Sequence, residues 1–201
     1  HLDLDAADDA AGLRDLLRHA DVFAQGYRAG ALARRGFGPA DVASLRPGVV
    51  VVSVDCYGHE GPWASRAGWE QLAQTATGMA HEHAGTDAAS IVPAAVLDYT
   101  TGHLAALGTL VALARRAREG GSWHVRVSLA RTAMWIQSLP RVPEGAAPSG
   151  LDPGVLRAHE IEMDTAWGRL PRLGPVLRMT ATPPRWSPPP PPLGNDPPRW
   201  R

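Results

Sequence analysis

The run Val49-Val50-Val51-Val52-Ser53-Val54 decides the fold class of this chain. A continuous stretch of β-branched residues is typical of a strand whose two faces are both buried. Such strands occur in parallel sheets that are covered by helices. The sequence therefore predicts a central parallel strand at residues 49–54.

The segments on both sides of this strand alternate between helical and extended patterns. Residues 6–19 have acidic residues in the first turn and a leucine stripe, which predicts a helix, and residues 20–25 follow as a short strand. The longest predicted helix covers residues 98–118 and ends at Gly120-Gly121. Further elements are expected at 31–35, 40–45, 68–79 and 130–139 (helices), 90–97 (extended) and 123–129 (strand). This alternation predicts an α/β fold, with a large domain over residues 1–139.

The composition changes after Pro140. Residues 140–158 are rich in Pro, Gly and Ala and are interpreted as a linker. Residues 159–201 are predicted to form a reduced C-terminal segment with two short strands before residue 180. The Pro-rich tail includes an unbroken run from Pro188 to Pro192, for which we expect polyproline II.

Charge and cysteine content exclude several classes of function. Lys+Arg and Asp+Glu number 20 each, so the formal net charge is zero. Nucleic acids and acidic membranes bind basic fields, so neither is expected as a partner. Cys56 is the sole cysteine, which fits a reducing, cytoplasmic compartment, and its thiol is interpreted as structural or incidental. No apolar run approaches the roughly 20 residues of a membrane helix.

Asp98 is the main candidate for a catalytic residue. It lies in the stretch Pro93-Ala94-Ala95-Val96-Leu97-Asp98-Tyr99-Thr100-Thr101-Gly102-His103, at the entry to the longest helix. One interpretation is an N-cap, because an aspartate there accepts a backbone N–H. The other is a nucleophile for an activated acyl group, with free N–H groups stabilising the oxyanion. Composition does not choose between them.

Several blocks of sequence, in order, carry a family resemblance. The blocks are Leu2-Asp3-Leu4, Ala20-Asp21-Val22, Arg28-Ala29-Gly30-Ala31-Leu32, Arg34-Arg35-Gly36-Phe37-Gly38, Val52-Ser53-Val54 with Tyr57-Gly58 and Gly61-Pro62, Glu70-Gln71-Leu72-Ala73-Gln74 with Thr77-Gly78, Asp98 with Thr101-Gly102, and Val127-Ser128-Leu129. From Leu2 to about Trp135 the chain resembles the family III CoA-transferases. That group includes formyl-CoA transferase, carnitine CoA-transferase and the alpha-methylacyl-CoA racemases.

The resemblance implies a fold and a chemistry. The large domain would be a parallel-sheet, nucleotide-fold-like domain that lacks the family's N-terminal segment and most of its small domain. Asp98 would be the catalytic nucleophile that moves CoA from an acyl-CoA to a small carboxylic acid through a covalent aspartyl intermediate, with Gly102 permitting close approach to the oxyanion. No metal and no tightly bound cofactor are expected, since coenzyme A is a substrate.

The resemblance also implies a CoA site, with departures from the family pattern. The expected CoA-binding residues are Gln25, Gly26, Arg28, Arg34 and Arg66. Many members carry asparagine where this chain has Gly26, and some carry a basic residue where it has Ala67.

Two other functions stay open. The first alternative is a catalytically inactive remnant that serves as a binding or partner subunit. The second is an acyl-CoA racemase or dehydratase-like enzyme. The racemase branch uses a histidine–aspartate pair where this chain has Trp69-Glu70, and indole exchanges no proton near neutral pH, which favours the transferase. His81 and His83 are interpreted as exposed loop residues. The resemblance implies an interlocked homodimer or a complementary chain.

Overall fold

The computed structural model describes residues 1–85, 88–141, 150, 152–186 and 188–200. The chain divides into two compact units, one formed essentially by Leu2–Leu139 and the other by Pro140–Arg199. Each unit is described by itself.

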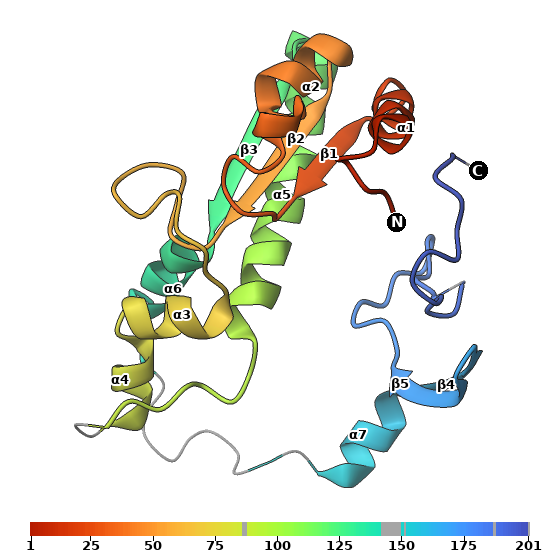
Figure 1. Ribbon diagram of the computed structural model, residues 1–201. Coiled ribbons are helices and arrows are strands. Elements are labelled where there is room, and N and C mark those ends of the chain that lie inside the picture. Colours follow the sequence, from red (N-terminus) through yellow and green to blue (C-terminus); the bar gives the residue numbers. More distant parts are fainter. Residues whose placement is uncertain (86–87, 142–149, 151, 187, 201) are drawn as a thin grey trace. The chain divides into compact units, whose positions relative to one another are not determined.

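A three-stranded parallel sheet forms the centre of the first unit (Figure 1). Its strands are β1 (Val22–Gln25), β2 (Val50–Asp55) and β3 (Trp123–Ser128), in the spatial order β1-β2-β3. Val50 is the partner of Val22 on one side and of Trp123 on the other. The valine run thus forms the central strand, and the predicted parallel α/β class is confirmed.

Helices cover both faces of this sheet. On one face, α1 (Ala7–Leu17) and α2 (Pro39–Leu45) pack with Phe37 of the intervening segment against Val49 and Val51. On the other face, α5 (Val96–Glu119) places Ala105 and Ala112 against the sheet. A short 3-10 helix, η1 (Ala33–Arg35), precedes α2.

Small side chains let α5 lie close to the sheet. A Cβ added at Gly108 would come within 2.8 Å of a Val125 methyl carbon. No heavy side chain fits at that distance, so glycine is required there by packing.

A third core cluster packs around the N-terminal end of α5. It contains buried residues of α3 (Glu70–Ala76), α5 and α6 (Leu129–Gln137), with Met79 at the start of α4 (Met79–Ala84). Leu97 of α5 is fully buried there, and so are Ala73 and Ala133. The first turn of α5 is therefore fixed by its neighbours, which matters because that turn carries Asp98.

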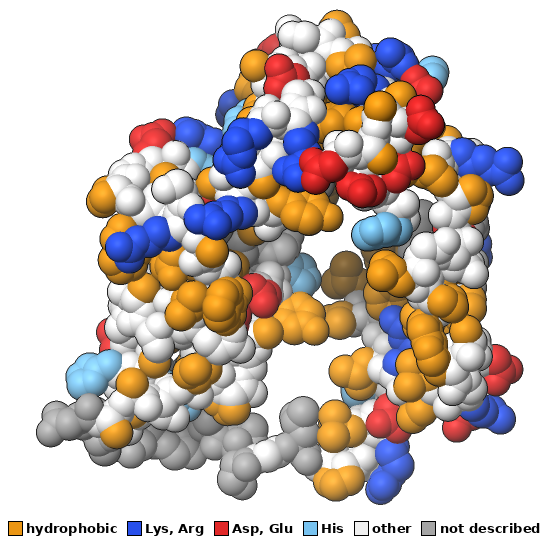
Figure 2. Space-filling model, viewed as in Figure 1, with side chains coloured by type: hydrophobic (Ala, Val, Ile, Leu, Met, Phe, Trp, Pro, Cys, Tyr) orange, Lys and Arg blue, Asp and Glu red, His pale blue; other side chains and the backbone are white. Residues whose placement is uncertain are grey.

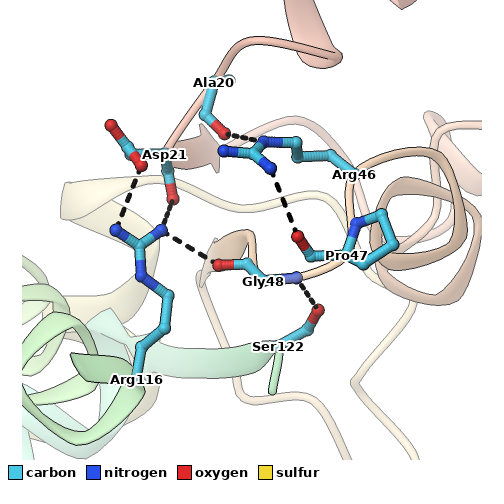
Figure 3. A network of polar contacts seen from close by, with 7 residues as sticks. All are labelled: Ala20, Asp21, Arg46, Pro47, Gly48, Arg116 and Ser122. Atoms are coloured by element: carbon cyan, nitrogen blue, oxygen red, sulfur yellow. Dashed lines mark hydrogen bonds and ion pairs between the residues drawn. The ribbon is translucent and has the colours of Figure 1, made fainter. Parts of the chain in front are cut away.

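The C-terminal half of α5 is tied to the sheet by Arg116 (Figure 3). Its guanidinium donates to the Gly48 carbonyl at 3.0 Å and to an Asp21 carboxylate oxygen at 3.0 Å. Gly48 in turn donates its N–H to Ser122 Oγ at 2.9 Å. The contacts link α5 to the segments that lead into all three strands, so the helix is held at both ends.

Two helix predictions need correction. The helix predicted over residues 68–79 is divided into α3 and α4, because Gly78 adopts the left-handed conformation with φ 80°. The longest helix begins at Val96, two residues before the predicted start, and no strand forms over residues 90–95.

The second unit contains α7 (Pro153–His159) and an antiparallel hairpin of β4 (Glu160–Thr165) and β5 (Gly168–Leu173). The two short strands predicted after residue 159 are confirmed. Helix α7 lies where the sequence predicted a linker, and it begins with Asp152 accepting the Gly154 N–H at 2.7 Å. Linker residues 142–149 and 151 lie outside the described residues.

Helix α5 meets the length and composition of a membrane span, with a mean hydropathy of 1.2 over its most apolar window. The expectation that no segment reaches this level is therefore wrong. The same helix packs on the sheet through Ala105 and Ala112 and carries Arg116 in its last turn.

Candidate active site

Asp98 lies in the first turn of α5 and does not cap it. Helix α5 begins at Val96, and its N-cap residue, Ala95, offers no side-chain acceptor. The Glu70 carboxylate of α3 takes this role: Oε1 accepts the Leu97 N–H at 3.1 Å, and Oε2 accepts the Asp98 N–H at 2.6 Å. The N-cap interpretation of Asp98 is therefore wrong, and its carboxylate is available for other contacts.

Glu70 is itself held in a fixed position. Its side chain is 3% exposed, and Oε1 also accepts the Gln74 side-chain N–H at 2.7 Å. Gln74 is fully buried and accepts the Val92 N–H at 2.9 Å. The three hydrogen bonds that the Glu70 carboxylate accepts offset the free-energy cost of removing it from water. The pair Glu70–Gln74 thus fastens the start of α5 to α3.

Asp98 faces a cavity of about 320 Å³. The wall is supplied by the segments that follow β1 and β2, by residues 66–69 before α3, and by the starts of α5 and α6. The cavity thus lies at the carboxyl ends of parallel strands, where ligands bind in open α/β sheets. The Asp98 side chain is exposed there.

The surroundings of Asp98 favour its neutral form more than water does. Partial burial raises the pKa of the Asp98 carboxyl, and the negative charge of Glu70 raises it further. A carboxylate with a raised pKa is a stronger base and nucleophile when ionised, as covalent catalysis requires.

Cys56 lines the same cavity but is held as a thiol. Burial raises its pKa to about 11, and Sγ lies 3.7 Å from the Trp69 carbonyl, to which it donates. A protonated thiol is a poor nucleophile. The interpretation of Cys56 as a non-nucleophilic residue agrees with this environment.

Four of the sequence-predicted site residues meet in this cavity: Gly26, Arg28, Arg66 and Asp98. Arg66 also lies over the Trp63 ring, 4.5 Å from its centroid. The cavity therefore combines the carboxylates of Asp98 and Asp55 with two arginines, whose guanidinium groups can pair with anions.

Gly26 leaves free space in this wall. A Cβ added there would meet only Val54, at an ordinary 3.9 Å, and the backbone of Gly26 is not in the left-handed region. A side chain at this position would therefore fit, which is relevant to the asparagine that many members of the resembled family carry.

The other three predicted residues lie elsewhere. Gln25 ends β1 and uses its side-chain oxygen to accept the Tyr27 N–H at 2.9 Å, beside a small cavity of about 50 Å³ that Arg28 also lines. Arg34 lies in η1, next to Gly30. Gly102 is inside α5, where its N–H is directed to the carbonyl of the preceding turn, so it is not free to bind an oxyanion.

None of the described residues that line the Asp98 cavity is a histidine. His81 and His83 are exposed, as expected, but they lie on α4 and not in a loop. Within the described ranges, no group of three or more His, Cys, Asp or Glu side chains is arranged to hold a metal ion.

Sequence reasoning missed the part that Glu70 plays. The sequence places Glu70 in one of the blocks that carry the resemblance and at the position of the racemase acid/base pair, and neither feature predicts a contact with α5. Its hydrogen bonds to Leu97 and Asp98 span 27 and 28 residues. The one signal in the sequence is the lack of a side-chain cap at Ala95.

The comparisons with known proteins agree with this architecture. Residues 1–149 match the family described as "CoA-transferase family III", and the chain belongs to that family. An acetyl-coenzyme A transferase, nodX, of Hypoxylon pulicicidum is 37% identical over 142 residues, covering 67% of this chain and 24% of that protein. The succinyl-CoA–L-malate CoA-transferase beta subunit of Chloroflexus aurantiacus is 27% identical over 130 residues, covering 64% of this chain and 32% of that protein.

A solved structure shares the fold. The crystal structure of Rv3272 from Mycobacterium tuberculosis superimposes with a TM-score of 0.64 at 28% identity, covering 68% of this chain and 39% of that one. The chain thus spans about a quarter to two fifths of the length of these relatives.

Proposed function

We propose that this chain carries the nucleophile of an acyl-CoA:carboxylate CoA-transferase and that Asp98 forms the covalent intermediate. One observation carries the proposal: Glu70 caps α5, which leaves the Asp98 carboxylate exposed at a cavity with Arg28 and Arg66. Membership of a CoA-transferase family supports CoA thioesters as substrates.

The proposed reaction begins with attack of an Asp98 carboxylate oxygen on the thioester carbonyl of the donor. The C–S bond breaks, CoA leaves as a thiolate, and a mixed anhydride remains on Asp98. The thiolate then attacks the Asp98 acyl carbon, releasing the donor acid and forming an aspartyl-CoA thioester. The acceptor carboxylate attacks this thioester, and the released thiolate finally takes the acceptor acyl group, which frees Asp98.

The arginines have positioning roles in this proposal. Arg28 and Arg66 line the Asp98 cavity and would pair with phosphate groups of CoA, for which guanidinium geometry is suited. Gln25 and Arg34 would contribute from the neighbouring small cavity and η1. No tightly bound cofactor is needed for this chemistry.

The direct test is a trapped adduct. The full chain is incubated with a panel of acyl-CoA thioesters, quenched and analysed by peptide mass spectrometry, with hydroxylamine to cleave activated acyl groups. We expect a hydroxylamine-sensitive modification on the peptide that contains Asp98, absent from Asp98→Ala. Asp8→Asn is the matched control, because Asp8 is an exposed first-turn carboxylate of α1. Wild-type protein without an adduct would contradict the proposal.

The inactive-remnant alternative has its own support. Neither Gly26 nor Ala67, which both line the cavity, places a polar side chain in it. Such a remnant would bind CoA without forming the adduct, so CoA binding with no modified peptide selects it. The racemase alternative has weaker support, because the Glu70 carboxylate is engaged by backbone N–H groups. Solvent deuterium at the substrate α-carbon, without CoA transfer, would select it.

We also propose that a second chain, either another copy or a complementary subunit, covers α5. Three side chains on α5 of this chain are exposed: Leu107 by 58%, Leu110 by 65% and Val111 by 46%. On the face of the molecule drawn in Figure 2, hydrophobic side chains reach the surface beside arginines. Exposed apolar surface of this kind marks contact sites. Sedimentation of the full chain should show an assembly that Leu110→Arg weakens.

A cytoplasmic location, without nucleic-acid or membrane partners, completes the proposal.

A further inference from the structure

A second cavity, of about 910 Å³, lies at the carboxyl end of β3 between α5 and α6. We refer to it as the α5–α6 cleft. It shares no lining residue with the Asp98 cavity among the described residues. Successive residues, Ser128 and Leu129, line the cleft and the Asp98 cavity respectively, so the β3–α6 junction forms part of the partition between them.

One wall of the cleft is apolar. Leu104 of α5 is half-buried, and Met134 and Trp135 of α6 are 54% and 46% exposed. Large apolar side chains in a concave setting lose contact with water when an apolar ligand enters, which favours binding.

Two arginines, Arg126 and Arg131, also line the cleft, and Arg131 is one helical turn before Met134 and Trp135 on α6. Arg126 is paired with Glu60 at 3.1 Å, and the His59 ring nitrogen Nε2 is 3.2 Å from the Val127 carbonyl. In the part of the chain that the structure describes, the guanidinium of Arg131 makes no hydrogen bond or ion pair. The Arg131 backbone N–H donates to Ser128 Oγ at 3.3 Å, which caps α6 and fixes the backbone from which the exposed side chain extends.

We propose that the α5–α6 cleft binds an amphipathic organic acid. The carboxylate would pair with the Arg131 guanidinium, whose planar donors match a carboxylate. The hydrocarbon or aromatic body would lie on Met134 and Trp135. A small molecule is favoured over a protein segment, because the cleft is hollowed between a loop, a strand end and two helices and has the size of ligand pockets. This site is independent of the chemistry at Asp98.

The test uses octanoate as the probe, with octanol and acetate for comparison, and measures affinity by titration calorimetry on the full chain. Octanoate should bind more tightly than both, because octanol lacks the charge and acetate lacks the apolar body. Arg131→Gln should weaken octanoate about threefold to tenfold, the range for an exposed to half-buried charge pair. Arg118→Gln, an exposed arginine at the end of α5, should leave affinity unchanged.

Three results would overturn the proposal. Octanol binding as well as octanoate would remove the role of the carboxylate, and unchanged affinity in Arg131→Gln would place the acid elsewhere. Absence of octanoate binding together with self-association that Trp135→Ala abolishes would assign the cleft to a protein partner. Asp98→Ala should retain octanoate binding, so this inference and the proposed transferase activity can fail separately.

Discussion

Replacing Glu70 by glutamine tests how the start of α5 is fixed. The wild-type carboxylate offers one oxygen to the Leu97 N–H and the other to the Asp98 N–H, at 3.1 and 2.6 Å. An amide has one acceptor oxygen, so one of these two donors would lose its partner and face an NH₂ group. The side chain is 3% exposed, which leaves little access for water to replace the lost bond.

The expected loss of stability follows from these contacts. A buried donor without an acceptor costs about 1–3 kcal/mol. For a unit of this size, each kcal/mol lowers the melting temperature by roughly 3–5 °C. For Glu70→Gln we therefore expect the free energy of unfolding, measured in urea, to fall by about 1–3 kcal/mol, and the melting temperature to fall in proportion. The control Glu60→Gln removes an exposed ion pair with Arg126 and should cost at most about 1 kcal/mol.

A second measurement separates positioning from stability alone. The negative charge of Glu70 contributes to the raised pKa of Asp98, after burial. Removing that charge lowers the Asp98 pKa, so the acid limb of the pH profile for adduct formation should move to lower pH. The reasoning is refuted if Glu70→Gln loses less than about 0.5 kcal/mol and its acid limb stays in place.

Three further predictions follow from the same geometry. Asp98→Asn should stabilise the protein at neutral pH, because a carboxyl whose pKa is raised in the folded state destabilises that state above the raised pKa. The gain in the free energy of unfolding should be at most about 0.5 kcal/mol, because the side chain is exposed. Urea unfolding at several pH values should show the gain disappear below the unfolded pKa of 3.8. Gly26→Asn should tighten CoA binding in calorimetry without lowering the melting temperature, and a loss of stability would show that the space beside Val54 is not free. Arg116→Lys should cost about 1–2 kcal/mol in urea unfolding, because an ammonium cannot reach the Gly48 carbonyl and the Asp21 carboxylate in the same fork geometry; equal stability would assign Arg116 a solvated role.

Local patterns predicted the scaffold well. The valine run at residues 49–54 fixed the central strand, because its burial on both faces leaves a continuous apolar signal. The glycines at 120 and 121 marked the end of α5 correctly. Elements whose boundaries depend on their own residues were therefore within reach of the sequence.

The contacts around Asp98 were not within reach in the same way. The cap of α5 is supplied by Glu70, which is distant in sequence, whereas a rule that looks for a cap next to the helix offers only Asp98 as a candidate. The break at Gly78 depends on a left-handed backbone angle that helical periodicity does not reveal. A tertiary contact decided the first case and the backbone conformation of a single glycine the second.

The thiol of Cys56 beside Asp98 has a consequence for selectivity. A thiolate in that cavity would exchange with acyl-CoA directly, because thiol–thioester exchange yields an S-acyl cysteine in competition with attack by the carboxylate. With a pKa of about 11, only about one Cys56 in ten thousand is ionised at pH 7. In the proposed transferase, burial of Cys56 would thus suppress a competing nucleophile and leave the thioester to the Asp98 carboxylate.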